Sequence, residues 1–297
     1  MSKKITIFTD ADLDGAGCVL IFKWLFPEWS ISYKAVNERT FNEAFKAFTK
    51  TDNFTKTDRI YICDLNVIDQ DINLLSDTRI CYIDHHSTSF DRPPGFLGGV
   101  LCEASPSCAS LVYKLVKVES NIELNQYQKL LLALIDDYDD YTLKYKFSLQ
   151  LNTVFYGQQG DRIQGFCEKF KDGFKGFDAH QTNIVHYHEL KVNQILENLN
   201  VFTANLSLDG KPYKLMSTFA DYAINEVASH LIKKYNADIA IVINDKTNAV
   251  SFRKNRGLNY DISRLAKLVA DGAGNANAAG GKLTDKMLVF SKTFQPV

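Results

Sequence analysis

The chain has 297 residues, of which 45% are hydrophobic, and its formal net charge is −1 at pH 7. This composition is typical of a globular protein with a packed core, and the length allows two domains. The near-neutral charge argues against a protein held to nucleic acid by bulk positive charge, although a local basic groove remains possible. Six cysteines without a CxxC pair, no signal peptide and no bilayer-length apolar stretch predict a cytoplasmic protein with free thiols.

The first part of the chain alternates strand and helix patterns. We expect strands at residues 4–9, 31–36, 59–63, 79–83 and 96–101. Helical spacing of apolar residues predicts helices at 15–26, 42–49, 108–118 and 125–135. This alternation predicts an α/β fold with a doubly wound parallel sheet. Residues 147–177, rich in Gly, Gln, Phe and Lys, allow no assignment.

The second part of the chain shows a different pattern. A helix at 178–199 is followed by expected strands at 201–206, 213–218, 239–244 and 250–253, by helices at 221–235 and 263–269, and by a strand-like segment at 287–290. Residues 244–248 suggest a hairpin, and residues 272–281 are rich in glycine. We therefore expect a first α/β domain at 1–177, a helical linker at 178–200 and a smaller α/β domain at 201–297.

Three aspartates, Asp10, Asp12 and Asp14, follow the first expected strand and precede Gly15. In a continuing strand they would share one face, and their charges would repel unless a cation bound them. A solvated loop whose aspartates cap the next helix explains them equally well. The glycine allows the chain to turn tightly into that helix.

Further acidic and imidazole side chains end other predicted elements. Asp64 ends the third strand, although an ordinary turn aspartate is the simpler interpretation when it is taken alone. Asp84, His85 and His86 end the fourth strand, where one histidine can bind a metal while the other faces a substrate and Asp84 orients an imidazole. A purely structural pair of histidines is the alternative. Because parallel strands end at one sheet edge, these residues predict a metal site there.

Asp136 and Asp137 follow the helix expected at 125–135. Negative charge is unfavourable at the carboxyl end of a helix, which suggests that these aspartates serve a purpose. An exposed acidic loop is the alternative. The spacing does not distinguish between the two residues as metal ligands.

The order D-x-D-x-D-G, a strand-end Asp, D-H-H and an acidic residue after an apolar helix resembles the DHH phosphoesterase superfamily, including its oligoribonucleases and RecJ-like enzymes. This resemblance implies two divalent cations, most often Mn²⁺, with Mg²⁺ possible. It assigns one ion to Asp10, Asp12 and Asp64, and the other to Asp14, Asp64, His85 and Asp137, with Asp136 as the competing choice. His86 would act beside the scissile phosphate as a catalytic residue, and Asp84 would hold the histidines in place.

The C-terminal part is similar to the DHHA-type substrate-binding domain of that superfamily. The resemblance implies that substrate contacts come from Arg253, Gly272, Gly274, Asn275, Gly280 and Gly281. The sequence departs from the family pattern in having Asn275 in place of a histidine and Ala273 in place of a glycine. Because asparagine carries no charge, we expect a weaker phosphate contact at that position.

The resemblance implies a metal-dependent phosphodiesterase that cleaves short oligonucleotides or linear dinucleotides to 5′-mononucleotides. Two alternatives remain open: a phosphomonoesterase acting on a nucleotide such as 3′-phosphoadenosine 5′-phosphate, and a nucleotide-binding protein without catalysis. The expected partner is short single-stranded nucleic acid or a dinucleotide, with no membrane, and a homodimer is possible.

Overall fold

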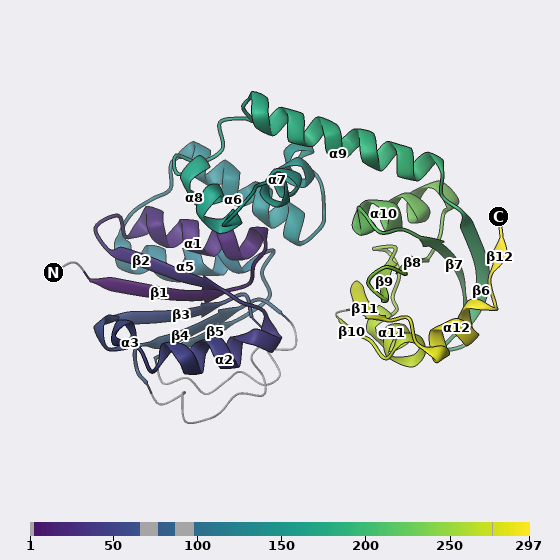
Figure 1. Ribbon diagram of the computed structural model, residues 1–297, viewed down its shortest axis with the longest axis horizontal. Coiled ribbons are helices and arrows are strands. Elements are labelled where there is room, and N and C mark those ends of the chain that lie inside the picture. The colour runs from purple at the N-terminus through teal and green to yellow at the C-terminus, as the bar shows by residue number, and fades with distance from the viewer. Residues whose placement is uncertain (1–2, 66–76, 87–97, 275) are drawn as a thin grey trace. The chain divides into compact units, whose positions relative to one another are not determined.

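The computed structural model describes residues 3–65, 77–86, 98–274 and 276–297. The chain forms two compact units, Met1–Val185 and His186–Val297 (Figure 1). The boundary falls within the long helix α9 (Ala179–Glu197), whose residues were expected to form a separate linker. Among the helices in the described ranges, none has the length and hydropathy that a membrane span requires.

The first unit is built on a parallel sheet of five strands in the order β2-β1-β3-β4-β5. The strands are β1 (Lys4–Thr9), β2 (Ser30–Ala35), β3 (Arg59–Cys63), β4 (Ile80–Asp84) and β5 (Val100–Cys102). The chain moves from β1 outward to β2 and then to β3 on the other side of β1. Open sheets bind ligands where the strand order reverses in this way, outside the carboxyl ends of the strands.

Helices cover both faces of this sheet, which confirms the predicted doubly wound fold (Figure 1). One face packs against α1 (Leu13–Leu25), α5 (Cys108–Ser120) and α6 (Gln126–Asp139), with α7 (Lys146–Tyr156) and α8 (Arg162–Lys169) further along the chain in the same hydrophobic core. The other face packs against α2 (Glu38–Phe48) and the short α3 (Asp52–Lys56), with Phe8 of β1 in ring contact with Phe41, Phe45 and Phe48.

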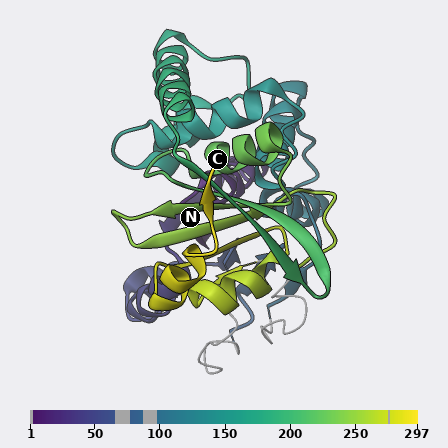
Figure 2. The same cartoon turned by 90° about the vertical axis from the view of Figure 1, so that its right-hand side faces the viewer.

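The second unit is a smaller α/β domain, as predicted. Its mixed sheet has the order β10-β11-β9-β8-β7-β6-β12, in which only β7 and β8 are parallel among the described pairs. The strands are β6 (Val201–Leu208), β7 (Lys211–Phe219), β8 (Ile239–Asn244), β9 (Ala249–Lys254), β10 (Ala273–Gly274), β11 (Ala278–Lys282) and β12 (Gln295–Pro296). One hydrophobic cluster packs the sheet against α10 (Ile224–Tyr235), and another packs it against α11 (Ile262–Ala270) and α12 (Asp285–Ser291) (Figure 2).

Some local predictions differ from the structure. Residues 287–290, expected to be strand-like, lie in α12, where the Thr284 side chain caps the helix by accepting from the Met287 amide. Residues 147–177, which allowed no assignment, contain α7 and α8. The helix expected to end at 135 continues to Asp139. Of the strand expected at 96–101, residues 96 and 97 lie outside the described residues, and β5 begins at Val100.

Candidate metal centre

Acidic residues terminate three strands that are neighbours in the first sheet. Asp10 follows β1, Asp64 follows β3, and Asp84 ends β4. The register pairs Thr9 with Cys63, and Cys63 with Ile83, so the three strands end at the same level. Asp64 has a φ of 56°, a left-handed conformation that costs a non-glycine residue energy and recurs at functional sites. The sheet edge therefore brings these three carboxylates together, as expected from the sequence.

The helix that follows β1 adds two more carboxylates. Asp12 is the N-cap of α1, and its Oδ1 accepts a hydrogen bond of 2.9 Å from the Gly15 amide, so the capping interpretation is correct for this residue. Asp14 is 1% exposed and accepts 2.7 and 2.8 Å bonds from the backbone amides of Cys108 and Ala109. These amides begin α5, where the helix dipole favours a negative charge. The two amides thereby fix the orientation of the Asp14 carboxyl group, although burial still raises its pKa.

His85 has one nitrogen bound to the backbone and the other among carboxylates. Its Nδ1 lies 3.1 Å from the Ser105 carbonyl oxygen, which can only accept a hydrogen bond, so Nδ1 carries the proton. In the neutral ring Nε2 then presents a lone pair. Nε2 lies 3.7 Å from Asp14, 3.5 Å from Asp64 and 3.4 Å from Asp139. A lone pair facing three carboxylates is unfavourable unless a cation or a proton lies among them.

The potential ligand atoms fall into two overlapping groups. In each group the atoms lie within 4.8 Å of one another, and the groups are Asp64, His85, His86 and Asp14, His85, Asp139. Such a mixture of carboxylate oxygen and imidazole nitrogen is suited to divalent transition-metal ions. His85 belongs to both groups.

The carboxylates also raise one another's pKa values. Burial raises the pKa of Asp64 and of Asp139 well above the usual range, and the charges of Asp14 and Asp12 raise both further. Burial and then the charge of Asp14 raise the pKa of Asp12 to about 7. Burial likewise raises the pKa of Asp10. A bound cation would remove this repulsion, so the donor set fits a metal centre.

His86 is held by Asp84 at the rim of this centre. Its Nδ1 lies 2.7 Å from Oδ1 of Asp84, whose Oδ2 lies 3.0 Å from the Tyr82 hydroxyl. Burial alone would lower the pKa of His86, but the hydrogen bond and charge of Asp84, with the charge of Asp14, raise it. The imidazole therefore keeps a proton to higher pH than a free histidine. Nδ1 is occupied by Asp84, so any further hydrogen bond of the ring must come from Nε2.

Asp137 does not lie among the clustered residues, contrary to our expectation. Its carboxylate accepts hydrogen bonds from the Thr142 hydroxyl, from the amides of Lys144 and Tyr145 at 2.9 Å each, and from the Ser148 hydroxyl at 2.6 Å. Burial would raise its pKa, but these donors lower it to about 2. Asp137 thus holds the turn between α6 and α7 and stabilises the start of α7.

Asp139 occupies the place that we expected for Asp137. Because α6 continues to Asp139, Asp136 and Asp139 are three positions apart and lie on one helix face, whereas Asp137 is rotated by roughly 100° from Asp136. Continuing the helical spacing from Leu132 through Asp136 to Asp139 would have pointed to Asp139 as a candidate ligand. Asp136, the competing choice, accepts hydrogen bonds from the hydroxyls of Ser107 and Ser110 and so links α6 to the start of α5.

The expected substrate residues of the second unit have structural partners. The Arg253 guanidinium donates to Asn225 Oδ1 at 2.7 Å and to the Phe252 carbonyl oxygen at 3.1 Å. A side chain at Gly272 or Gly274 would meet the backbone of the β10–β11 hairpin at 2.2 or 2.4 Å. A side chain at Gly281 would meet Ala270, whereas Gly280 has room for one. Close backbone packing therefore accounts for three of the four glycines, and Asn275 lies outside the described residues.

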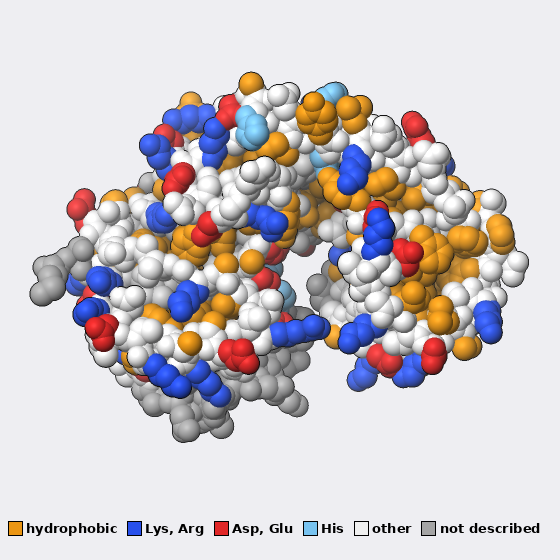
Figure 3. All heavy atoms as spheres, viewed as in Figure 1, with side chains coloured by type: hydrophobic (Ala, Val, Ile, Leu, Met, Phe, Trp, Pro, Cys, Tyr) orange, Lys and Arg blue, Asp and Glu red, His pale blue; other side chains and the backbone are white. Residues whose placement is uncertain are grey.

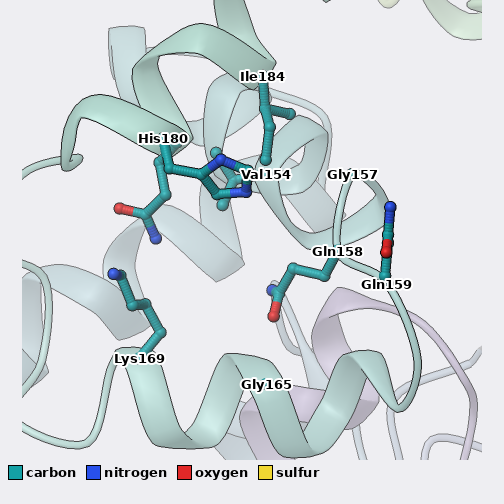
Figure 4. A pocket seen from close by; sticks show the side chains of 9 residues that line it. Val154, Gly157, Gln158, Gln159, Gly165, Lys169, His180 and Ile184 are labelled. Carbon is teal, nitrogen blue, oxygen red and sulfur yellow. The ribbon is translucent and has the colours of Figure 1, made fainter.

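A cavity of about 400 Å³ lies elsewhere in the first unit, among α7, α8 and the start of α9 (Figure 4). Lys169, His180 and Gln158 line it, and none of the clustered acidic residues does. Lys169 pairs with Asp178 at the start of α9. On the face seen in Figure 3, Lys and Arg side chains are interspersed with Asp and Glu side chains, in keeping with the net charge of −1.

Comparison with known proteins identifies the first unit. The model of the DHH family, N-terminal domain, matches residues 4–135. Residues 4–135 therefore resemble the N-terminal domain of the DHH family. The match includes Asp10, Asp64 and the Asp84-His85-His86 run, and it ends four residues before Asp139. No protein of curated function matches the chain significantly.

Solved structures share the two-domain fold at low identity. The pGpG-specific phosphodiesterase PggH from Vibrio cholerae is 14% identical, with a TM-score of 0.55, and the match covers 97% of this chain and 96% of PggH. RecJ from Thermus thermophilus, solved with Mn²⁺, is 11% identical with a TM-score of 0.58, covering 98% of this chain and 51% of RecJ. An exopolyphosphatase-related protein from Bacteroides fragilis is 14% identical with a TM-score of 0.51, covering 98% and 91%. These likenesses support the fold of both units.

Proposed function

We propose that this protein is a phosphodiesterase that hydrolyses short oligonucleotides or linear dinucleotides to 5′-mononucleotides with two bound divalent cations. The observation that carries the proposal is the environment of His85. Its Nδ1 is bound to a carbonyl oxygen, and its Nε2 faces three carboxylates at 3.4 to 3.7 Å. This arrangement favours a cation among them.

The acidic cluster offers ligands for two cations with a shared carboxylate. One set would be Asp10, Asp12 and Asp64, and the other Asp14, Asp64, His85 and Asp139. A set containing imidazole suits Mn²⁺ better than Mg²⁺, which prefers oxygen and water. When bound, such ions supply a deprotonated water near neutral pH and positive charge beside the phosphoryl oxygens.

His86 and Asp84 would act on the substrate itself. The Asp84 carboxylate fixes the ring through Nδ1 at 2.7 Å and helps the imidazole to hold a proton. The protonated ring can donate from Nε2 to a phosphoryl oxygen or protonate the leaving oxygen. His86 is therefore our candidate for the catalytic acid, and Asp84 for the residue that positions it.

Both the near-neutral net charge of the chain and its similarity to PggH favour a short substrate. A net charge of −1 provides little attraction for a long polyanion. PggH, described as acting on the dinucleotide pGpG, matches over nearly its whole length, whereas about half of Thermus RecJ is matched. We therefore place dinucleotides first among the substrates to be tested.

The test uses metal-stripped full-length protein, Mn²⁺, and 5′-labelled RNA and DNA from dinucleotides to about 20 nucleotides. Asp139→Asn removes a proposed ligand, and Asp140→Asn is the matched control, because Asp140 is an exposed aspartate at the next position. We expect Mn²⁺-dependent release of mononucleotides, greatest for the shortest substrates, that is lost in Asp139→Asn and kept in Asp140→Asn.

Other substrates in the same assay separate the alternatives. Phosphate release from 3′-phosphoadenosine 5′-phosphate alone would replace the proposal with a phosphomonoesterase. Release from polyphosphate alone would indicate cleavage of phosphoanhydrides. Mn²⁺-dependent nucleotide binding without turnover of any substrate would refute the enzymatic proposal and favour the binding protein.

A further inference from the structure

Tyr156 and Arg162 form an exposed aromatic–cation pair at the corner between α7 and α8. Tyr156 is the last residue of α7 and is 47% exposed. The guanidinium carbon of Arg162, the first residue of α8, lies 5.1 Å from the centre of the tyrosine ring. This pair presents a flat aromatic surface and a flat cationic surface on neighbouring positions.

A hydrogen bond ties this corner to the carboxyl edge of the sheet. The Tyr33 hydroxyl donates to Oδ2 of Asp161 at 2.7 Å, and Asp161 is the N-cap of α8. Tyr33 of β2 is paired with Ile7 of β1, two positions before the end of both strands. The residue after β1 is Asp10. The corner is therefore anchored beside the edge that carries the acidic centre.

The electrostatics agree with this position. Burial first, and then the charges of Asp12 and Asp10, raise the pKa of Tyr156 to about 12. Coulombic effects of this kind require that the groups lie near one another. Together with the Tyr33–Asp161 hydrogen bond, this indicates that the corner between α7 and α8 lies on the same side of the first unit as Asp10 and Asp12.

We propose that Tyr156 and Arg162 form a stacking surface for a nucleobase of the substrate, beside the acidic centre. This inference rests on the proposed function and deepens it, because it requires a base adjacent to the cleaved phosphate. Every nucleobase has an aromatic face, so the contact is tolerant of sequence. A phosphate chain without bases would gain nothing from it.

The same unit contains a matched pair that serves as a control. Tyr127, near the start of α6, is 41% exposed, and the Lys175 ammonium lies 5.4 Å from its ring centre. Neither residue belongs to the acidic centre. If cation–ring pairs in this unit serve only local stability, replacing Tyr127 and Tyr156 will have the same consequence.

The test compares hydrolysis of a dinucleotide with that of the same sugar-phosphate compound lacking both bases, in Mn²⁺. The variants are Tyr156→Leu, which keeps apolar bulk without a ring, Tyr156→Phe, which keeps the ring, and Tyr127→Leu. The measured quantity is the ratio of kcat/KM values for the two compounds. We expect Tyr156→Leu to lower this ratio about five- to 150-fold, the range of one base-stacking contact, and the other variants to keep the wild-type preference.

A ratio unchanged in Tyr156→Leu, or lowered equally in Tyr127→Leu, would overturn the inference. Hydrolysis of neither compound by the wild type would instead count against the proposed function. Calorimetric binding of AMP and of ribose 5-phosphate in Mn²⁺ provides a second readout without turnover. Weakened binding of AMP alone in Tyr156→Leu supports the stacking surface, and equal affinities in variant and wild type overturn it.

Discussion

Asp137 and Asp139 provide the sharpest test of the centre, because replacing each by asparagine should have opposite consequences. Asp137 accepts four hydrogen bonds, two of them from backbone amides. Asparagine keeps one oxygen and loses the charge, so part of this network is left unsatisfied. Hydrogen bonds to charged groups contribute about 1.5–3 kcal/mol each. We expect Asp137→Asn to lower the free energy of unfolding by about 2–3 kcal/mol, or roughly 4–12 °C in Tm for a unit of this size.

Asp139→Asn should behave differently. Burial and the charges of Asp14 and Asp12 raise the pKa of Asp139, so its ionised form is destabilised in the metal-free protein. Removing that charge should leave Tm unchanged or raise it without metal. Mn²⁺ at 100 times its dissociation constant stabilises a protein by about 2.7 kcal/mol, and Asp139→Asn should lose most of this gain.

Thermal unfolding in EDTA and in Mn²⁺ measures both effects, with Asp140→Asn as the control. We expect a low Tm that still responds to Mn²⁺ for Asp137→Asn, and a normal Tm without this response for Asp139→Asn. The reverse pattern would show that Asp137 is the ligand and that the interpretation of α6 is wrong.

Three further predictions concern the same unit. Gly15→Ala places a Cβ 2.2 Å from the Asp10 carbonyl oxygen, so urea denaturation should show that the free energy of unfolding falls by more than about 2 kcal/mol. A variant as stable as the wild type would contradict this geometry. Asp84→Asn should lower the pKa of His86, measured by NMR titration, because its bond and charge raise that pKa; an unchanged value would refute the positioning role. The pKa of Asp137 in the folded protein is lowered to about 2, so the stability that its carboxylate contributes is present above pH 4 and is lost as pH falls towards 2. The difference in the free energy of unfolding between wild type and Asp137→Asn should therefore disappear over that range.

Local sequence patterns were sufficient to locate an element where its residues are buried in a regular pattern along the chain. The apolar runs of β1, β3 and β8 were located to the residue, because a buried strand must be apolar along its length. Alternation of strands and helices determined a parallel sheet, and parallel strands bring their carboxyl ends to one edge. The sequence therefore determined that Asp10, Asp64 and Asp84 lie near one another.

Only the tertiary structure decided which carboxylate of α6 joins them. The three candidates on α6 are all aspartates, Asp136, Asp137 and Asp139. The directions in which their side chains point depend on how far the helix continues. Asp137 is engaged by donors up to 11 residues later in the chain, and Asp14 by amides 94 and 95 residues away. Such long-range bonds leave no local periodicity. The sequence determined the sheet edge and its charges, whereas packing between helices determined which charges face the centre and which hold the fold.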